Sequence, residues 1–296
     1  MLRLSALGDV IHTIPAVVGL RESGFDVSWV VEAPYRELVE IVAKVRAIPV
    51  QLKTWSRSPG QVRDALRDIR GHEIAVDFQG LLKSAGFAWL SRAPARYGFD
   101  RDAIREKPAV FFTNRRVRVD RSRHVVEWNL QLAEAVAGKS LHPRPDFAPF
   151  ATGAGLEKYR GRTVLLPGAG RVEKQWPVDR FREVARAHGP RTLVVWGPGE
   201  QKLAEEIGGE IAPKTNLREL AFLLKNAAVV VGGDTGPLHL AAAFGTRVVG
   251  LYGPTDPRRN GPYGQLASCI SEFGRSESMA AIQPAEVMKR IEEVAR

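Results

Sequence analysis

Short apolar runs alternate with longer segments of helical spacing along the chain. In the first half, strand-length runs at 26–31 and 73–78 each precede a segment whose apolar residues recur at helical intervals. The same alternation returns later, with apolar runs that begin at Arg162, Arg191, Ala227 and Thr246. Nearly continuous Val and Leu runs are typical of parallel strands that are covered on both faces. The pattern therefore predicts an α/β protein with two doubly wound domains.

One stretch, LHPRPDFAPFATGAG at 141–155, interrupts this alternation with prolines and glycines and indicates a linker region. We therefore predict an N-terminal domain at 1–153 and a C-terminal domain at 154–283. The last segment, 284–296, is expected to be a helix that packs back on either domain, the N-terminal one included.

Composition indicates a globular protein and bears on its cellular compartment. The chain has 296 residues, of which 44% are hydrophobic, so each domain can bury a core. No run of about 18 uncharged apolar residues occurs, and no basic region followed by an apolar block opens the sequence. We expect a cytoplasmic protein without a membrane span or signal peptide. The single cysteine, Cys269, is expected to be a buried filler, with no His or Cys cluster around it for zinc.

Positive charge is concentrated in one segment. The chain carries 43 Lys and Arg against 33 Asp and Glu, and the segment 96–123 alone holds nine basic residues and four acids. Nucleic acid, anionic lipid and an acidic small substrate all fit such a segment, and so does a merely solvated surface. Its aromatic residues lie in apolar runs, which counts against stacking on single-stranded nucleic acid. They are Tyr97, Phe99, Phe111 and Phe112.

The stretch GGDTGPLHLAAAFG at 232–245 predicts an anion site. Asp234 and Thr235 can cap a helix after a buried strand, and Pro237 fits its first turn. The free N–H groups and positive end of such a helix attract phosphate, with His239 one turn further on. An ordinary capped helix is the alternative. An aspartic protease would need a second Asp-Thr-Gly loop, which the chain lacks.

The stretch LPGAGRVEKQWP at 166–177 is a second glycine turn after a strand. Gly168 and Gly170 resemble a dinucleotide fingerprint, but Glu173 stands where the third glycine would be, so a dehydrogenase is disfavoured. Lys174 is well placed on this turn to meet a phosphate. Glu200 follows the next strand, where a carboxylate can bind a ribose diol or simply favour a helix start.

The N-terminal half has fewer candidates. Asp9 stands between a Ser-Ala-Leu-Gly turn and an apolar helix, where a helix cap is the simplest role for it. Gln79 and Lys83 follow the strand at 73–78, and His12 lies one turn into the first helix, where a packed core histidine is equally reasonable. No Gly-x-Ser-x-Gly elbow, phosphate-binding Walker loop or metal-ligand spacing is present.

Four stretches taken together, LSALGDVIHTIPA, DFQGLLKSA, GAG…EKQWP and GGDTGPLHLAAAFGTRVVGLYGPTDP, resemble the lipopolysaccharide heptosyltransferases of glycosyltransferase family nine. The first two are most similar to the type I enzymes. The resemblance implies a GT-B architecture, in which two Rossmann-like domains face a central cleft. It also implies a hexosyltransferase-type enzyme that moves heptose, with inversion and without a metal or cofactor, from ADP-L-glycero-β-D-manno-heptose to a Kdo residue of Kdo-lipid A.

The resemblance also implies site residues. Asp9 matches the general base and Lys174 the lysine near the donor phosphates. The donor phosphates are expected at Gly168, Gly170, Asp234, Thr235, Gly236 and His239. Backbone amides of Ala169 and Gly170 replace the hydroxyls that are usual in that turn. The nucleoside is expected at Glu200, Lys214 and Thr215, and the acceptor at His12, Gln79, Lys83, Arg96 and Arg105.

The expected setting is the cytoplasmic face of the inner membrane, where a monomer meets an ADP-sugar and Kdo-lipid A without nucleic acid. Two alternatives remain open, a related transferase (type II, or one with another nucleotide-sugar donor) and a non-catalytic binder of nucleotide or nucleic acid. One departure concerns the first strand, since only Met1–Leu4 precede the turn. Such a short strand is expected to weaken the sheet and to displace Asp9.

Overall fold

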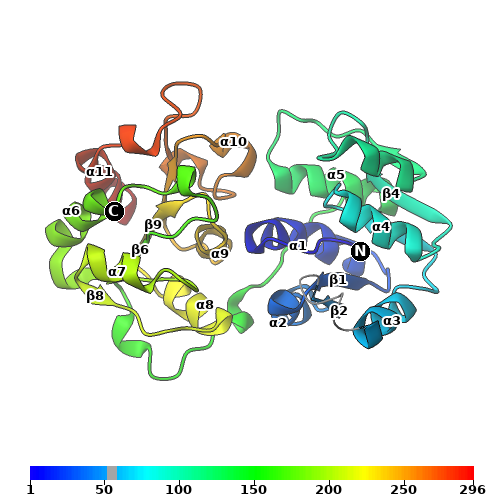
Figure 1. Cartoon of the computed structure of the whole chain (residues 1–296), viewed down its shortest axis with the longest axis horizontal. Coiled ribbons are helices and arrows are strands. Elements are labelled where there is room, and N and C mark those ends of the chain that lie inside the picture. Colours follow the sequence, from blue (N-terminus) through cyan, green and yellow to red (C-terminus); the bar gives the residue numbers. More distant parts are fainter. Residues whose placement is uncertain (52–58) are drawn as a thin grey trace. The chain divides into compact units, whose positions relative to one another are not determined.

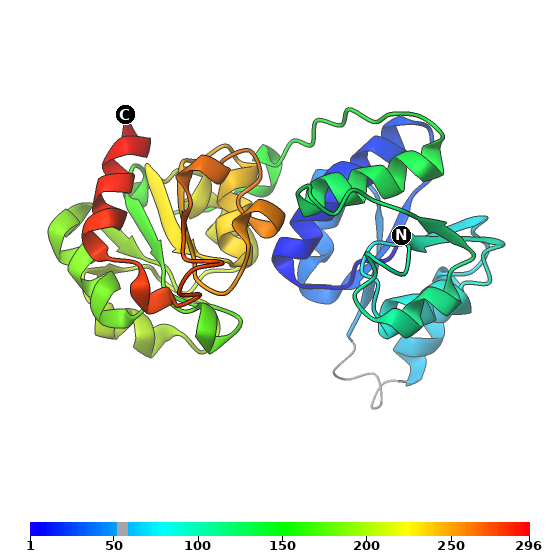
Figure 2. The same cartoon turned by 90° about the horizontal axis from the view of Figure 1, so that it is seen from above.

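The computed structural model describes residues 1–51 and 59–296 and divides into two compact units, Met1–Asp146 and Phe147–Arg296. In each unit the strands form an inner layer and the helices lie around it (Figure 1). The second view shows the chain passing from α5 into the second unit through an extended stretch (Figure 2). The two α/β units that the sequence predicts are present.

The N-terminal unit contains parallel strands only, in the part that the structure describes. They are β1 (Ser28–Glu32), β2 (Arg46–Val50), β3 (Ile74–Asp77), β4 (Ala95–Phe99) and β5 (Arg115–Val117). Strand β1 pairs with β2, and β4 lies between β3 and β5. The helices are α1 (Leu7–Glu22), α2 (Arg36–Leu38), α3 (Pro59–Asp68), α4 (Leu82–Leu90) and α5 (Val125–Ala137).

The segment Met1–Leu4 joins these two groups of strands. The Leu2 amide donates to the Val76 carbonyl at 2.9 Å, and the Val30 amide on the other side donates to the Met1 carbonyl at 2.9 Å. The sheet therefore runs β2, β1, 1–4, β3, β4, β5, which is the doubly wound order 3-2-1-4-5-6. The first strand is short, as expected, but backbone bonds hold it on both sides.

The C-terminal unit repeats this order. Its six parallel strands are arranged β11-β10-β9-β6-β7-β8. Their bounds are β6 (Thr163–Leu166), β7 (Thr192–Val194), β8 (Glu210–Ile211), β9 (Val229–Gly233), β10 (Val248–Tyr252) and β11 (Ile270–Ser271). The helices are α6 (Val178–His188), α7 (Gln201–Ile207), α8 (Leu217–Lys225), α9 (Gly236–Ala243), α10 (Pro257–Asn260) and α11 (Pro284–Ala295).

Two boundaries differ from those predicted. The second unit begins at Phe147, before the predicted 154, because the residues after 146 pack into it. Phe147 stacks edge to face with Phe244, with 6.2 Å between ring centroids, and Phe150 is fully buried. Helix α11 belongs to this unit and not to the N-terminal one. Its apolar side chains join the core of the C-terminal unit, where Trp176 donates to the Ile282 carbonyl just before the helix.

Candidate functional site

In the C-terminal unit the candidate site lies where the strand order reverses. Strands β6 and β9 are neighbours, and the chain leaves them toward opposite sides of the sheet order. Ligands of doubly wound sheets bind beyond the carboxyl ends of the strands at such a point. Gly168 follows β6 and Asp234 follows β9, so the two glycine-rich turns that the sequence singles out meet there.

Asp234 is the centre of a charged network in this unit. Its Oδ2 lies 2.6 Å from Lys174 Nζ, and its Oδ1 lies 3.1 Å from His239 Nε2. Burial of the Asp234 side chain by itself would raise its pKa, but the bonds to His239 and Lys174 outweigh burial and lower the pKa below its usual value. The network holds Lys174 beside the start of α9, although the two residues are 60 positions apart.

The start of α9 carries the features of an anion site. Thr235 is the residue before the helix, Pro237 lies in its first turn, and the first N–H groups of any helix lack intrahelical acceptors. The Thr235 hydroxyl oxygen is buried and has no hydrogen-bond partner within residues 1–51 and 59–296. Lys174, this hydroxyl and the positive helix end give one place where a diphosphate could be neutralised.

Glycine leaves room where these turns approach each other. A Cβ on Gly233 would lie 2.9 Å from the Lys174 carbonyl oxygen, so any side chain there would push the lysine turn away. A Cβ on Gly168 would lie 2.1 Å from both carboxylate oxygens of Glu200. The carboxylate of Glu200 also accepts from the Gly197 amide at 2.8 Å. Glu200 therefore lies across the turn that follows β6.

The other residues predicted to bind the donor substrate lie outside the charged network of Asp234. Gly236 opens α9, and Gly170 is exposed on the turn before Lys174. Lys214 is exposed and Thr215 half-buried, and both precede Asn216, whose side chain caps α8 with Glu219 in a capping box. The structure thus brings Lys174, Asp234 and His239 together, and leaves the role of the 214–215 segment a prediction.

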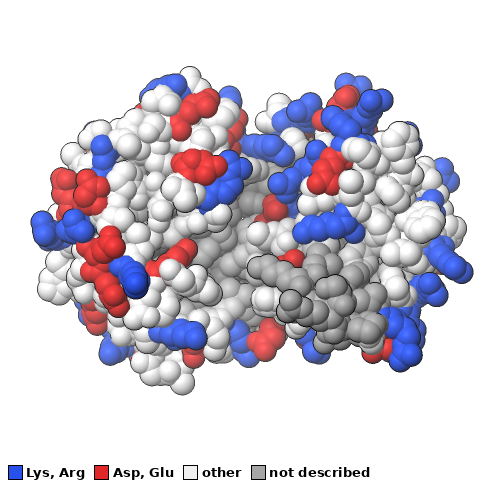
Figure 3. Space-filling model, viewed as in Figure 1, with Lys and Arg blue, Asp and Glu red and all other residues white. Residues whose placement is uncertain are grey.

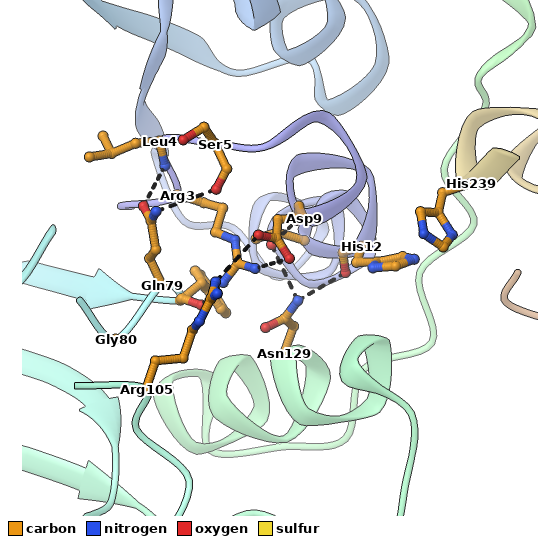
Figure 4. A network of polar contacts seen from close by, with 12 residues as sticks. Arg3, Leu4, Ser5, Asp9, His12, Gln79, Gly80, Arg105, Asn129 and His239 are labelled. Atoms are coloured by element: carbon orange, nitrogen blue, oxygen red, sulfur yellow. Dashed lines mark hydrogen bonds and ion pairs between the residues drawn. The ribbon is translucent and has the colours of Figure 1, made fainter. Parts of the chain in front are cut away.

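In the N-terminal unit Asp9 is held by two arginines (Figure 4). Its Oδ1 lies 2.5 Å from Arg3 Nη2, and its Oδ2 lies 3.7 Å from Arg105 Nη1. The Arg3 side chain is only 5% exposed, whereas that of Asp9 is 31% exposed. The residue before the helix is Ala6, and no side chain caps it, so Asp9 is not the helix cap. The short first strand does not displace Asp9, because Arg3 of that strand holds it.

Gln79 positions the turn before Asp9. Its amide is buried, accepts from the Leu4 amide at 2.9 Å and donates to the Ser5 carbonyl at 3.3 Å. The backbone amide of Gln79 in turn donates to Asp77 Oδ1 at 2.9 Å. Burial raises the pKa of Asp77 despite these bonds. Contact of Gln79 with an acceptor stays a prediction, and its observed contacts are with the chain itself.

The remaining predicted acceptor residues have different surroundings. His12 is buried and packs edge to face against His124, with ring centroids 5.2 Å apart, as expected of a core histidine. Lys83 is exposed on α4. Arg96 donates to the carbonyls of Ala93 and Phe112, at 2.8 and 3.0 Å, so its guanidinium holds two loops together. Arg105, which is exposed, forms an ion pair with Asp9.

Sequence reasoning missed Arg3 and Asp77. Arg3 donates to the Phe78 carbonyl as well as to Asp9, and so ties the first strand to the end of β3. A signal was present, since a charged residue between Leu2 and Leu4 is unusual in a buried strand. Asp77 offered none, because an acid at the end of a strand is common and its burial depends on the whole fold.

A family model described as glycosyltransferase family 9 (heptosyltransferase) matches residues 62–288. This chain belongs to glycosyltransferase family 9. Two curated relatives are named lipopolysaccharide heptosyltransferase 1. The one from Escherichia coli strain K12 is 31% identical over 90% of each chain. The one from Pseudomonas aeruginosa is 32% identical over 90% of this chain and 81% of its own.

Solved structures of heptosyltransferases share the fold. The E. coli heptosyltransferase WaaC with ADP superimposes with a TM-score of 0.82 at 27% identity, over 99% of this chain and 98% of that chain. WaaC with ADP-2-deoxy-2-fluoro heptose gives 0.81. The E. coli ADP-heptose heptosyltransferase II gives 0.74 at 19% identity and supports the fold alone. The predicted family and GT-B fold class are confirmed.

Within residues 1–51 and 59–296, no three His, Cys, Asp or Glu side chains lie together as a metal site would require. Across the same residues, no helix is both long and apolar enough to cross a membrane.

Proposed function

We propose that the protein is a hexosyltransferase-type heptosyltransferase of type I. It transfers heptose from ADP-L-glycero-β-D-manno-heptose to a Kdo residue of Kdo-lipid A. Support comes from the type 1 relatives, similar over 90% of the chain, and from the likeness to WaaC with ADP. The single observation that carries the proposal is the Lys174–Asp234–His239 network at the start of α9. It holds the Lys174 ammonium beside the N-terminus of α9, where a nucleotide diphosphate would bind.

The donor binds in the C-terminal unit. Its diphosphate meets the N-terminus of α9, the Thr235 hydroxyl and Lys174, with backbone amides of the 168–170 turn as further donors. Glu200 accepts from the ribose, and the 214–215 segment contacts the adenine. Because the leaving ADP gathers negative charge, these preorganised groups stabilise the transition state more than the ground state, and one such donor is typically worth about 3 kcal/mol.

Asp9 acts as the general base. A Kdo hydroxyl oxygen attacks the anomeric carbon, the bond from that carbon to the ADP oxygen breaks, and the hydroxyl proton passes to the Asp9 carboxylate. Attack from the face opposite ADP inverts the anomeric centre, so one carboxylate suffices. General base catalysis of this kind contributes about 10²- to 10⁴-fold. Neither a metal nor a cofactor has a part in this scheme, since Lys174 and the helix start neutralise the diphosphate.

The acceptor and the location follow from the charge of the N-terminal unit. Kdo carries a carboxylate and lipid A carries phosphates, which the exposed Lys83 and Arg105 would attract. The protein works as a monomer in the cytoplasm, on the inner face of the anionic membrane that holds the acceptor, without nucleic acid.

The experiment compares Asp9→Asn with the wild type. Transfer from ADP-heptose to Kdo-lipid A should fall by about 10²-fold or more, while the dissociation constant for ADP stays the same. Asp26→Asn is the matched control, an acid of the same unit outside the site. Normal turnover of Asp9→Asn would reject the base assignment. Added chelator should leave transfer by the wild type unchanged.

A related transferase with another donor is the competing function. Thermal shifts with ADP, UDP and GDP separate the two, because a ligand of the native state raises the melting temperature by mass action. We expect stabilisation by ADP. Stabilisation by UDP alone would reject the assignment of the donor, and DNA binding without ADP binding would favour the non-catalytic alternative.

A further inference from the structure

Three large apolar side chains are exposed on the N-terminal unit. They are Leu82, Trp89 and Phe111, with exposed fractions of 45%, 57% and 79%. In the part of this unit that the structure describes, no other large apolar side chain is as exposed. Phe111 is almost free of contact with the core, and a Trp is normally well covered. Exposure of this kind calls for a partner that covers it.

Two of these residues share one face of α4, and the third lies on a segment that packs against this helix. Leu82 and Trp89 are seven positions apart on α4 and therefore lie on the same face of the helix, two turns apart. Phe111 belongs to a 3₁₀ helix, Lys107–Phe112, that packs against α4. We call this the α4 surface, formed by α4 and residues 105–112.

Hydrogen bonds hold the two segments of the α4 surface side by side. At one end Glu106 accepts from the Leu82 amide at 2.6 Å. At the other, Arg96 donates to the carbonyl of Ala93, shortly after α4, and to that of Phe112, the last residue of the 3₁₀ helix. Both ends are fixed, so Trp89 and Phe111 are presented from a firm support and not from a loose loop.

Exposed basic residues are frequent in and next to these segments of the sequence. The exposed members nearest in sequence are Lys83, Arg92, Arg101, Arg105 and Lys107, against three acids between 82 and 107. Blue Lys and Arg side chains are visible at several separate places on this unit in the space-filling view (Figure 3). The α4 surface thus combines aromatic side chains with a net positive charge.

We propose that the α4 surface docks the protein on an anionic phospholipid bilayer. Trp, Phe and Leu insert at the level of the headgroups, where aromatic rings are favoured, while Lys and Arg meet the lipid phosphates. The helix α4 has nine residues, enough to lie in the interface and far too few to span it. A second copy of the chain fits poorly, because it would bring two positive surfaces together.

Docking places the general base near the bilayer, and this step rests on the proposed function. Arg105 is part of the α4 surface, and its guanidinium lies 3.7 Å from Asp9. The next residue, Glu106, donates its amide to the Gly80 carbonyl and accepts from Leu82. A lipid-anchored acceptor whose acyl chains stay in the bilayer would therefore present its sugar end close to Asp9.

Sedimentation with vesicles tests the docking directly. The wild type should bind vesicles of phosphatidylcholine with phosphatidylglycerol, bind phosphatidylcholine alone weakly, and be released as salt rises from about 0.05 to about 0.5 M. The double variant Trp89→Ser/Phe111→Ser should bind at least about tenfold more weakly, because two apolar side chains no longer insert. The matched control is Tyr263→Ser/Phe273→Ser, which removes two exposed aromatics from the C-terminal unit and should bind as the wild type does.

Transfer assays separate docking from catalysis. The double variant should lose transfer to a vesicle-borne acceptor and keep transfer to a water-soluble Kdo acceptor without acyl chains. Unchanged vesicle binding by the folded double variant would overturn the proposal. Equal binding of the wild type to vesicles with and without phosphatidylglycerol would overturn it as well. A change in oligomeric state of the double variant on gel filtration would instead assign the surface to self-association. If the wild type binds vesicles through this surface but transfers no heptose, docking stands and the proposed function fails.

Discussion

A buried arginine, Arg3, holds the carboxylate of Asp9 at 2.5 Å from its guanidinium. The same guanidinium donates to the carbonyl of Phe78, at the end of β3. The bond to the Phe78 carbonyl holds the Arg3 guanidinium in place, and the guanidinium in turn orients the Asp9 carboxylate. Arg3 is therefore a positioning residue for the general base that we propose.

The first prediction concerns Arg3. Arg3→Met keeps the apolar stem but loses the ion pair, so kcat for heptose transfer should fall by about tenfold to hundredfold as Asp9 loses its orientation. Arg3→Lys should recover part of this loss, because it restores a cation. Steady-state kinetics measures kcat, and calorimetry measures the ADP dissociation constant, which should not change.

A matched control for Arg3→Met is Arg36→Met, which removes an exposed ion pair with Glu40 on the same unit. Such surface pairs contribute little, so its kcat should equal that of the wild type. If Arg3→Met and Arg3→Lys lost kcat equally and ADP binding fell as well, Arg3 would be only a structural residue.

A second prediction concerns Gly168→Ala. The new methyl group would collide with the Glu200 carboxylate, which is the mobile end of a flexible side chain and can move away. Stability should change little, but the dissociation constant for ADP should rise by about tenfold, because the bond from a charged carboxylate to the ribose is lost. Calorimetric titration measures it, and Glu200→Gln should show a similar loss. Gly86→Ala, with free space for its Cβ, is the control and should bind ADP normally. Normal affinity in Gly168→Ala would separate Glu200 from nucleotide binding.

The third prediction concerns acid stability. The pKa of Asp234 is lowered in the folded protein, so its ionised form stabilises the fold above the unfolded pKa near 3.8, and this stability is lost as pH falls through the folded pKa. Asp234→Asn should lower the free energy of unfolding by about 3 kcal/mol at neutral pH, because it breaks a largely buried pair and leaves Lys174 uncompensated. Urea unfolding at a series of pH values should show this difference shrinking below about pH 4.

A control for Asp234→Asn is Asp256→Asn, whose partner Arg258 is mostly exposed. We expect it to cost less than about 1 kcal/mol. If the difference in free energy of unfolding between the wild type and Asp234→Asn stayed constant down to the lowest pH, the charge of Asp234 would not be the source of its stabilising effect.

The fourth prediction concerns Cys269. Burial raises the pKa of its thiol to about 12, so very little thiolate forms at neutral pH. Native protein should react with iodoacetamide much more slowly than denatured protein, as mass spectrometry over time can measure. Rapid alkylation of the native protein would show that the thiol is accessible and reactive, contrary to the filler role.

Much of the C-terminal site could be predicted from the sequence. Lys174 and Asp234 each follow a strand at a glycine turn, and the reversal of strand order brings such turns together whatever the loops between them. The network bond to His239 follows from its place one turn into α9. The α/β alternation was equally readable, because buried parallel strands leave long Val and Leu runs.

Other features depend on contacts that the sequence does not reveal. Gln79 looks like a binding residue at a strand end, but its amide is used by Leu4 and Ser5, which are 74 or more positions away. Prolines and glycines indicate a linker at 141–155, but the second unit already begins at Phe147. Phe147 packs on Phe244, just after α9, and the Phe150 carbonyl accepts from Arg218 of α8. Long-range packing determines the contacts of Gln79 and the start of the second unit, and local composition does not reveal such packing.

The segment Met1–Leu4 links the stability of the N-terminal sheet to the position of the Asp9 carboxylate. Leu2 bridges the two halves of the sheet, and Arg3 holds Asp9. If the segment leaves the sheet, the halves lose their common strand and the carboxylate loses its partner at once. Amide hydrogen exchange at Leu2, Val30 and Phe78 should therefore rise together, and should track the fraction of molecules that have lost catalytic competence.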